Sequence, residues 1–126
     1  YFQTLDTAVN RAFVGAFKAR FGAEAVTSVW SEPAYSQVHL FARALERVGT
    51  MDTHRIGQEV LGLEYEAPGG RIHVDPETRH TWLTPRIGVA REDGLFDVVW
   101  ESGAPVHPDP YLATTRFEEP CLREWA

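Results

Sequence analysis

The residues best suited to binding chemistry lie in one short stretch, from Trp30 to Tyr35. Trp30 offers a flat apolar surface, and the Glu32 carboxylate can accept hydrogen bonds from an amide or an ammonium group. The stretch joins a β-rich segment to a helix start, and open α/β sheets bind ligands at such junctions. Chemistry alone favours the structural alternative, in which the tryptophan is buried and Glu32 stabilises the helix N-terminus.

The other chemically active residue types do not form a recognisable site. His73 and His80 flank a turn that holds Asp75 and Glu77, but their spacing matches no standard zinc pattern. We therefore expect solvated turn side chains there, and we predict no metal and no cofactor. The sequence has neither a phosphate-binding glycine loop nor a Gly-x-Ser-x-Gly elbow, so we predict no catalytic residues.

The elements that position Trp30 are predicted from apolar periodicity. Residues 7–21, 33–48 and 53–61 have helical patterns, and residues 25–30 form a short β-rich segment that we predict to be a buried strand. In the helix over 33–48 the apolar residues recur at helical spacing. They predict that its buried face consists of Ala34, Val38, Phe41, Ala42, Leu45 and Val48.

The second half of the chain is predicted to contain strands and turns, because seven of the eight prolines lie there. Strands are expected over residues 63–66, 71–75, 81–91 and 96–101, with a hairpin turn at Asp93-Gly94. We therefore divide the chain into a helical α/β part (1–62), a β ribbon (63–101) and an extended, proline-rich tail (102–126).

Composition limits the partners of the chain. Its 126 residues carry a net charge of −6, from 12 basic and 18 acidic side chains, and no basic stripe is present. Nucleic-acid binding is therefore excluded as a function class. The longest apolar run has six residues, whereas a membrane span needs ~20, so we expect no membrane insertion. Broad apolar helix faces beside one candidate core strand indicate part of a larger α/β structure.

Several motifs follow one another along the chain. They include Phe13-x-x-x-Phe17-x-x-Arg20-Phe21-Gly22, Trp30-x-Glu32-x-Ala34-Tyr35, Ala67-Pro68-Gly69-Gly70, Pro85-Arg86-Ile87 and Pro108-Asp109-Pro110-Tyr111. Their order resembles the C-terminal part of the type I periplasmic binding proteins, which are two-lobed receptors for branched-chain amino acids, urea and amides. The likeness is greatest to the amide and urea branch and extends over residues 1 to about 112, with glycine at position 69 where that branch usually has glutamine.

The resemblance implies an α/β fragment of a two-lobed fold, because the family's full chain is much longer. It implies that Trp30 lines the ligand cleft, with Glu32 and Tyr35 as further ligand-binding residues. The expected function is non-catalytic binding of a small amide, urea or amino acid as the substrate-binding component of an ABC transporter. A cytoplasmic amide sensor that regulates amidase expression is the alternative within the family, and an unrelated small enzyme or interaction domain is the alternative outside it.

The same resemblance predicts the partners and the compartment. A transporter permease or a regulatory protein is expected to bind the complete protein. A homodimer contact or the remainder of the chain is expected to cover the exposed helix faces. The expected location is the periplasm or cell envelope, with the cytoplasm as the alternative.

Overall fold

The computed structural model describes residues 1–112. Residues 113–126, with Cys121 and most of the expected tail, lie outside the described residues. The elements are α1 (Ala8–Phe21), α2 (Ser31–Val48), α3 (Thr53–Glu59), β1 (Glu64–Ala67), β2 (Gly70–Val74), β3 (Thr81–Trp82), β4 (Arg86–Ala90), β5 (Phe96–Glu101) and the 3-10 helix η1 (Pro110–Leu112). β1, β2 and β3 form an antiparallel sheet in that order, while β4 and β5 form a two-stranded antiparallel ribbon. Helices followed by antiparallel strands confirm the predicted α/β class.

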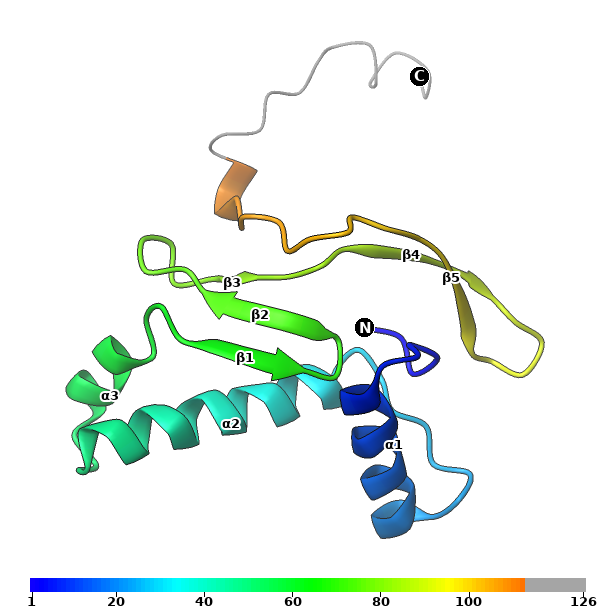
Figure 1. Cartoon of the computed structure of the whole chain (residues 1–126), viewed down its shortest axis with the longest axis horizontal. Helices are drawn as coiled ribbons and strands as arrows, with labels where there is room; N and C mark the ends of the chain where they lie inside the picture. The colour runs from blue at the N-terminus through cyan, green and yellow to red at the C-terminus, as the bar shows by residue number, and fades with distance from the viewer. Residues whose placement is uncertain (113–126) are drawn as a thin grey trace.

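The hydrophobic core lies between α2 and the three-stranded sheet (Figure 1). The helix runs along one face of the sheet, with α3 beside its C-terminal end and α1 near its N-terminal end. Strand alternation directs Ile72 and Val74 of β2 toward the helix. The core residues are Leu40, Ala44, Ile56, Leu63, Ala67, Ile72 and Val74.

The predicted buried face of α2 is wrong in its first half. Val38 and Phe41 are exposed, whereas Glu32 and Ser36 are buried. The two buried polar residues satisfy each other, since Ser36 Oγ donates a hydrogen bond of 2.9 Å to Glu32 Oε1. They therefore continue the stripe of Leu40 and Ala44 toward the sheet, and an apolar face of Ala34, Val38 and Phe41 is left on the opposite side.

The strand predicted over residues 25–30 is also wrong. These residues pair with no strand in the described part of the chain, and a strand needs a neighbour to satisfy its backbone groups. Instead, the Thr27 amide donates a 2.7 Å hydrogen bond to the side-chain oxygen of Gln3. The segment is therefore held by side chains, with only Thr27 buried.

The long strand predicted over residues 81–91 is divided into β3 and β4 by residues 83–85. Pro85 has no amide hydrogen for a strand ladder, although its carbonyl accepts from the Ser102 amide at 3.1 Å. The predicted turn at Asp93-Gly94 is confirmed: Gly94 has φ +78° and Asp93 Oδ1 accepts from the Leu95 amide at 3.1 Å. The predicted strand is thus interrupted at residues 83–85, and the ribbon closes through a local turn.

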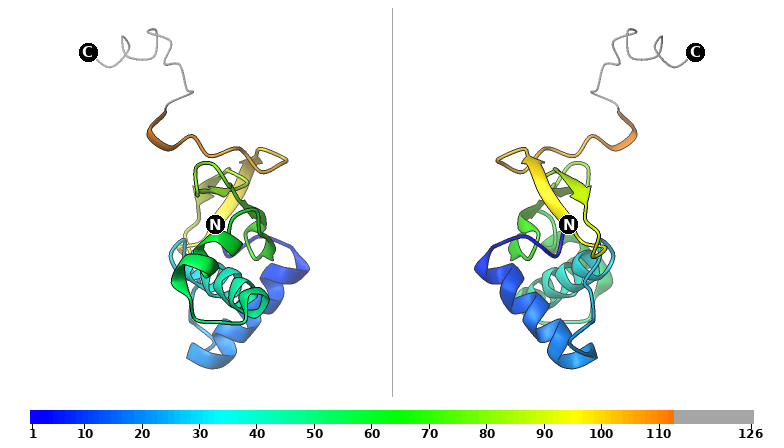
Figure 2. Two further views of the ribbon diagram at one scale, coloured as in Figure 1. Left: turned by 90° about the vertical axis from the view of Figure 1, so that its left-hand side faces the viewer. Right: turned by 90° about the vertical axis from the view of Figure 1, so that its right-hand side faces the viewer.

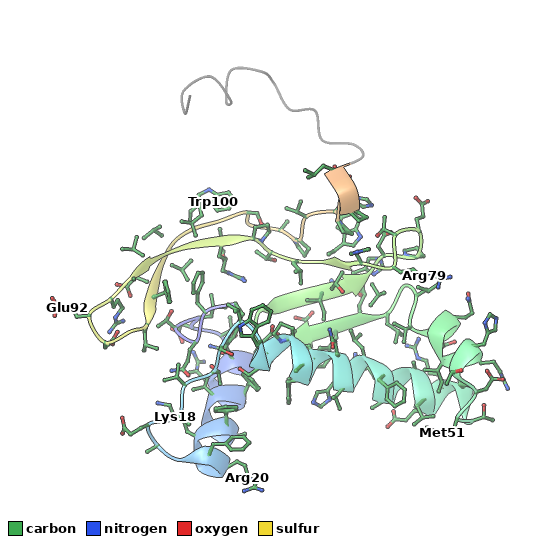
Figure 3. The ribbon with its side chains drawn as sticks, turned by 180° about the vertical axis from the view of Figure 1, so that it is seen from behind. Lys18, Arg20, Met51, Arg79, Glu92 and Trp100 are labelled. Atoms are coloured by element: carbon green, nitrogen blue, oxygen red, sulfur yellow. The ribbon has the colours of Figure 1, made fainter. Side chains whose placement is uncertain are left out.

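The N-terminal residues contact this ribbon, although they are distant from it in sequence. The Thr4 hydroxyl donates a hydrogen bond to the Phe96 carbonyl, 92 residues further along the chain. The centroids of the Phe2 and Phe96 rings are 5.2 Å apart. Figure 2 shows the N-terminus close to the ribbon in both side views. Figure 3 shows Trp100 on the opposite side of the ribbon, where it is half exposed.

Candidate functional site

The start of α2 is organised by two serines. The Ser28 amide donates to Ser31 Oγ at 2.7 Å, and Ser28 Oγ accepts from the amides of Trp30 and Ser31 at 3.2 and 3.3 Å. The first amides of a helix have no intrahelical acceptors, and the serine hydroxyl oxygens act as acceptors for them here. The amides of Trp30 and Ser31 are therefore already used within the chain.

The structure separates the three predicted ligand-binding residues. Trp30 is 82% exposed, so it belongs to no core of the described chain. Tyr35 is 38% exposed and packs its ring against Phe13, at 4.8 Å between centroids, and against His39, at 4.4 Å. Glu32 is only 7% exposed and points toward the sheet. Within residues 1–112, Trp30 has no ring contact or hydrogen bond with the side chain of either other residue.

The Glu32 carboxylate is fixed through one of its oxygens. Oε1 accepts from Ser36 Oγ at 2.9 Å and from the Gly69 amide at 3.4 Å. No hydrogen bond from residues 1–112 reaches Oε2. A carboxylate can accept on both oxygens, so Glu32 retains capacity for an external donor.

Glu32 also borders a small cavity of about 220 Å³ between α2 and the strands. Ser36, Gln37 and Thr81 add polar groups to its wall, while Leu40, Ile72 and Leu83 add apolar surface. Small-molecule sites commonly combine an apolar wall with a few polar groups, and their volumes begin at about 300 Å³. This cavity therefore suits a small ligand, or the part of a ligand that carries a hydrogen-bond donor.

A row of stacked side chains, missed by the sequence analysis, runs from α2 to β1. The His39 ring stacks on the Tyr65 ring with 5.3 Å between the two centroids. The Arg43 guanidinium lies 4.9 Å from the centroid of the same Tyr65 ring. Burial, followed by the hydrogen bond with Tyr35, raises the pKa of Tyr65 to about 12. The available signal was the spacing of Tyr35, His39 and Arg43, which places them on one helix face.

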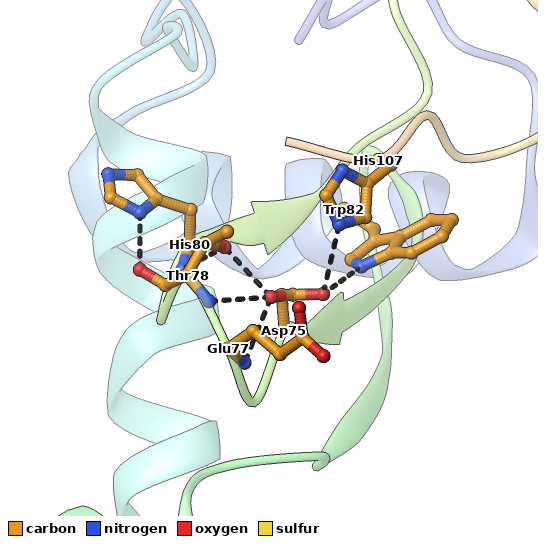
Figure 4. Close-up of polar contacts among 6 residues, drawn as sticks. All are labelled: Asp75, Glu77, Thr78, His80, Trp82 and His107. Atoms are coloured by element: carbon orange, nitrogen blue, oxygen red, sulfur yellow. Dashed lines mark hydrogen bonds and ion pairs between the residues drawn. The ribbon is translucent and has the colours of Figure 1, made fainter. Parts of the chain in front are cut away.

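Asp75 was predicted to be a solvated turn residue, but the structure shows that it is buried. Its Oδ1 accepts from the Glu77 amide at 3.1 Å, the Thr78 amide at 2.7 Å and the Thr78 hydroxyl at 2.9 Å. Its Oδ2 accepts from Trp82 Nε1 at 3.0 Å and lies 3.4 Å from His107 Nε2 (Figure 4). The Thr78 amide and the Trp82 indole hold the pKa of this carboxyl well below its usual range.

The Asp75 cluster fixes a turn. Within residues 1–112, no group of three His, Cys, Asp or Glu side chains is arranged to hold a metal ion. His80, exposed as predicted, bonds through Nδ1 to the Thr78 carbonyl at 2.8 Å. The described helices also include none with the length and apolar character of a membrane span.

An α/β unit of this kind, with apolar faces left open on α2 and on the β4–β5 ribbon, is part of a larger two-lobed solute-binding fold. The chain belongs to the periplasmic binding protein family, since residues 1–117 match the family described as periplasmic binding protein domain. The expected type I periplasmic binding protein resemblance is thereby confirmed.

Two of the following three relatives have names that agree with this assignment. A solved solute-binding protein of an ABC transporter from Rhodopseudomonas palustris BisB5, in complex with 3,4-dihydroxybenzoic acid, is 26% identical with a TM-score of 0.70, and the match covers 80% of this chain. The Leu/Ile/Val-binding protein homolog 6 of Brucella abortus is 33% identical over 76 residues, or 60% of this chain. A protein named limonene hydroxylase from Geobacillus stearothermophilus is 32% identical over 115 residues, or 91% of this chain.

All three relatives are much longer than this chain. The matched region covers 28% of the R. palustris protein, 20% of the Brucella protein and 21% of the Geobacillus protein. The chain therefore corresponds to one portion of the two-lobed fold.

Proposed function

We propose that the complete protein is the solute-binding component of an ABC transporter and binds a small molecule in the periplasm without transforming it. The family match supports the binding role. The exposed indole and the buried carboxylate at the start of α2 support the placement of the binding site there. Within this proposal Trp30 forms an apolar wall of the interlobe cleft, Glu32 accepts a donor of the ligand, and Tyr35 contributes from the next turn.

One observation carries the choice of ligand class: Glu32 lines a cavity, and its Oε2 accepts no hydrogen bond from residues 1–112. A carboxylate there attracts a cationic ammonium or an amide N–H donor and repels an ionised carboxylate such as benzoate. We therefore propose an amino acid, amide or urea as the ligand. Urea and amides are small enough for the cavity, and the ammonium end of an amino acid has the matching charge.

Calorimetric titration of the complete protein tests this proposal with L-leucine, acetamide, urea and benzoate as probes. At least one donor-bearing probe should bind, benzoate should bind at least tenfold more weakly, and Glu32→Gln should weaken the donor-bearing probe about tenfold. Glu46→Gln, an exposed substitution on the same helix, is the matched control and should leave affinity unchanged. Preference for benzoate, or turnover of limonene, would contradict the proposal.

The exposed apolar faces of this chain are proposed to contact the remainder of the complete protein. Val38 and Phe41 on α2 and Ile87 and Trp100 on the ribbon are all exposed in the described structure. Apolar patches of this kind mark interfaces. Sedimentation should show self-association of the isolated chain and a defined species for the complete protein.

Cell fractionation distinguishes the proposed periplasmic transport role, with a permease partner, from cytoplasmic amide sensing with a regulatory partner.

A further inference from the structure

Both backbone polar groups of Gly69 are bound by charged side chains from distant elements. Its amide donates to Glu32 Oε1 at 3.4 Å, and its carbonyl accepts from Arg86 Nη1 at 2.6 Å. Glu32 belongs to the first turn of α2, Arg86 is the first residue of β4, and Gly69 lies between β1 and β2. One glycine of a tight turn therefore connects the candidate ligand site to the ribbon.

Arg86 is itself held in place. Its Nε donates to Glu101 Oε2 at 3.0 Å, Nη1 also reaches the Thr84 carbonyl at 3.3 Å, and its side chain is only 11% exposed. Hydrogen bonds from a guanidinium are stronger than neutral ones and fix geometry through its planar fork. The guanidinium thus acts as a rigid support for the Gly69 carbonyl.

The Gly69 backbone packs directly against the Glu32 carboxylate. A Cβ atom at position 69 would lie 3.6 Å from both Glu32 oxygens, which is ordinary van der Waals contact. Because no side chain stands between them, a displacement of this turn changes both the hydrogen bond to Oε1 and the space around Oε2. The orientation of Glu32 therefore depends on what holds the turn.

We propose that Arg86 is a positioning residue for the ligand site: acting through Gly69, it orients the Glu32 carboxylate toward the ligand without touching the ligand. The inference rests on the proposed function, in which Glu32 receives a ligand donor. It adds a residue from the ribbon, 54 positions from Glu32 in sequence, to the determinants of affinity.

A double-mutant cycle on the complete protein, with L-leucine as the calorimetric probe, tests the coupling. Arg86→Met should weaken binding about tenfold in the wild-type background and less than about twofold in the Glu32→Gln background, because one effect acts through the other. Arg91→Met is the matched control, since Arg91 pairs with Asp93 and Asp97 on the same ribbon and should leave affinity unchanged. If Glu32→Gln has no effect, the proposed ligand contact is wrong. If it weakens binding and Arg86→Met does not, or the two effects add fully, the positioning role is wrong.

A second measurement does not need a ligand. With selective 15N-glycine labelling, amide hydrogen exchange at Gly69 should become about tenfold faster in Arg86→Met, while Gly94, whose amide donates to the Arg91 carbonyl, stays unchanged. Unchanged exchange at Gly69 would overturn the inference even if L-leucine fails to bind the wild type. If Arg86→Met does not fold, Arg86→Lys is measured in its place; it keeps the charge but loses the fork, and should show the same selective increase.

Discussion

The Trp82 indole donates a 3.0 Å hydrogen bond to the buried carboxylate of Asp75, which joins β3 to the turn that follows β2. Asp75 also accepts from Glu77 and Thr78 in that turn and lies 3.4 Å from His107. A single acidic side chain therefore collects donors from the turn and from β3, with His107 of a third segment beside it. Such a carboxylate should be important for the stability of the sheet.

Replacement of Asp75 by asparagine should destabilise the fold. An asparagine amide group has donors of its own, so one side of it would face N–H groups that need an acceptor. We expect the melting temperature of the complete protein to fall by about 2–4 °C. Asp97→Asn, at an exposed residue paired with Arg91, should change it by less than about 1 °C. An equal effect of both substitutions would contradict the role of Asp75.

The contribution of Asp75 should depend on pH in one direction. Its pKa is lowered in the folded state relative to about 3.9 in the unfolded chain, so folding favours the ionised form. The stabilisation is therefore fully present above about pH 5 and is lost as the pH falls through the lower, folded-state pKa. Urea unfolding from pH 6 to pH 2 should show a wild-type advantage over Asp75→Asn that shrinks only at the acidic end.

Trp30→Ala should affect binding and not stability. Its side chain is 82% exposed, so the free energy of unfolding should change by less than about 0.5 kcal/mol. If the indole lines the cleft of the complete protein, ligand affinity should fall by about 1–3 kcal/mol, the value of a buried apolar side chain. Calorimetry and thermal melting of the same variant measure the two effects. Unchanged affinity would remove Trp30 from the site.

Tyr65 should titrate at unusually high pH. Burial and the hydrogen bond with Tyr35 raise its pKa to about 12, compared with about 10 in an unfolded chain. Its contribution to stability is therefore complete below about pH 10 and is lost as the pH rises through 12. The difference in ultraviolet absorbance between wild type and Tyr65→Phe should have a midpoint near pH 12, and a midpoint near 10 would contradict the described packing.

Gly88→Ala should destabilise the ribbon through Phe2. An ideal Cβ at position 88 would lie 2.7 Å from Phe2 Cζ and 2.9 Å from Cε1, closer than real side chains approach. Displacing this ring from its contact with Phe96 should cost about 1–3 kcal/mol. Gly15→Ala in α1, where the added carbon meets no described atom within 4 Å beyond its chain neighbours and the backbone of its own helix, should stabilise by about 0.5–1 kcal/mol. Chemical denaturation compares the two variants directly.

Local signals predicted the parts of the fold that local chemistry determines. Asp93-Gly94 produced the turn, and Gly49, with φ +68°, ended α2 as its sequence position indicated. The buried face of α2 could not be predicted from periodicity, because Glu32 and Ser36 become suitable for burial only when they bond to each other and to Gly69. These partners are set by tertiary structure.

The same limit applies to the sites. The stretch from Trp30 to Tyr35 was visible as a chemically capable junction, but its residues point in different directions once the helix forms. Burial of Asp75 depends on Trp82 and His107, which sequence spacing does not bring together. Only the hydrogen bond from the Thr78 amide to Asp75 could have been predicted from the sequence, because an aspartate commonly accepts from amides two and three residues later.

The contacts of Phe2 and Thr4 with the ribbon are costly in chain entropy. The hydrogen bond from Thr4 to Phe96 closes a loop of 92 residues, whereas the β4–β5 ribbon pairs residues that are close in sequence. Contacts between distant residues form more slowly than local ones. The first four residues should therefore be among the last of the described chain to become ordered during folding.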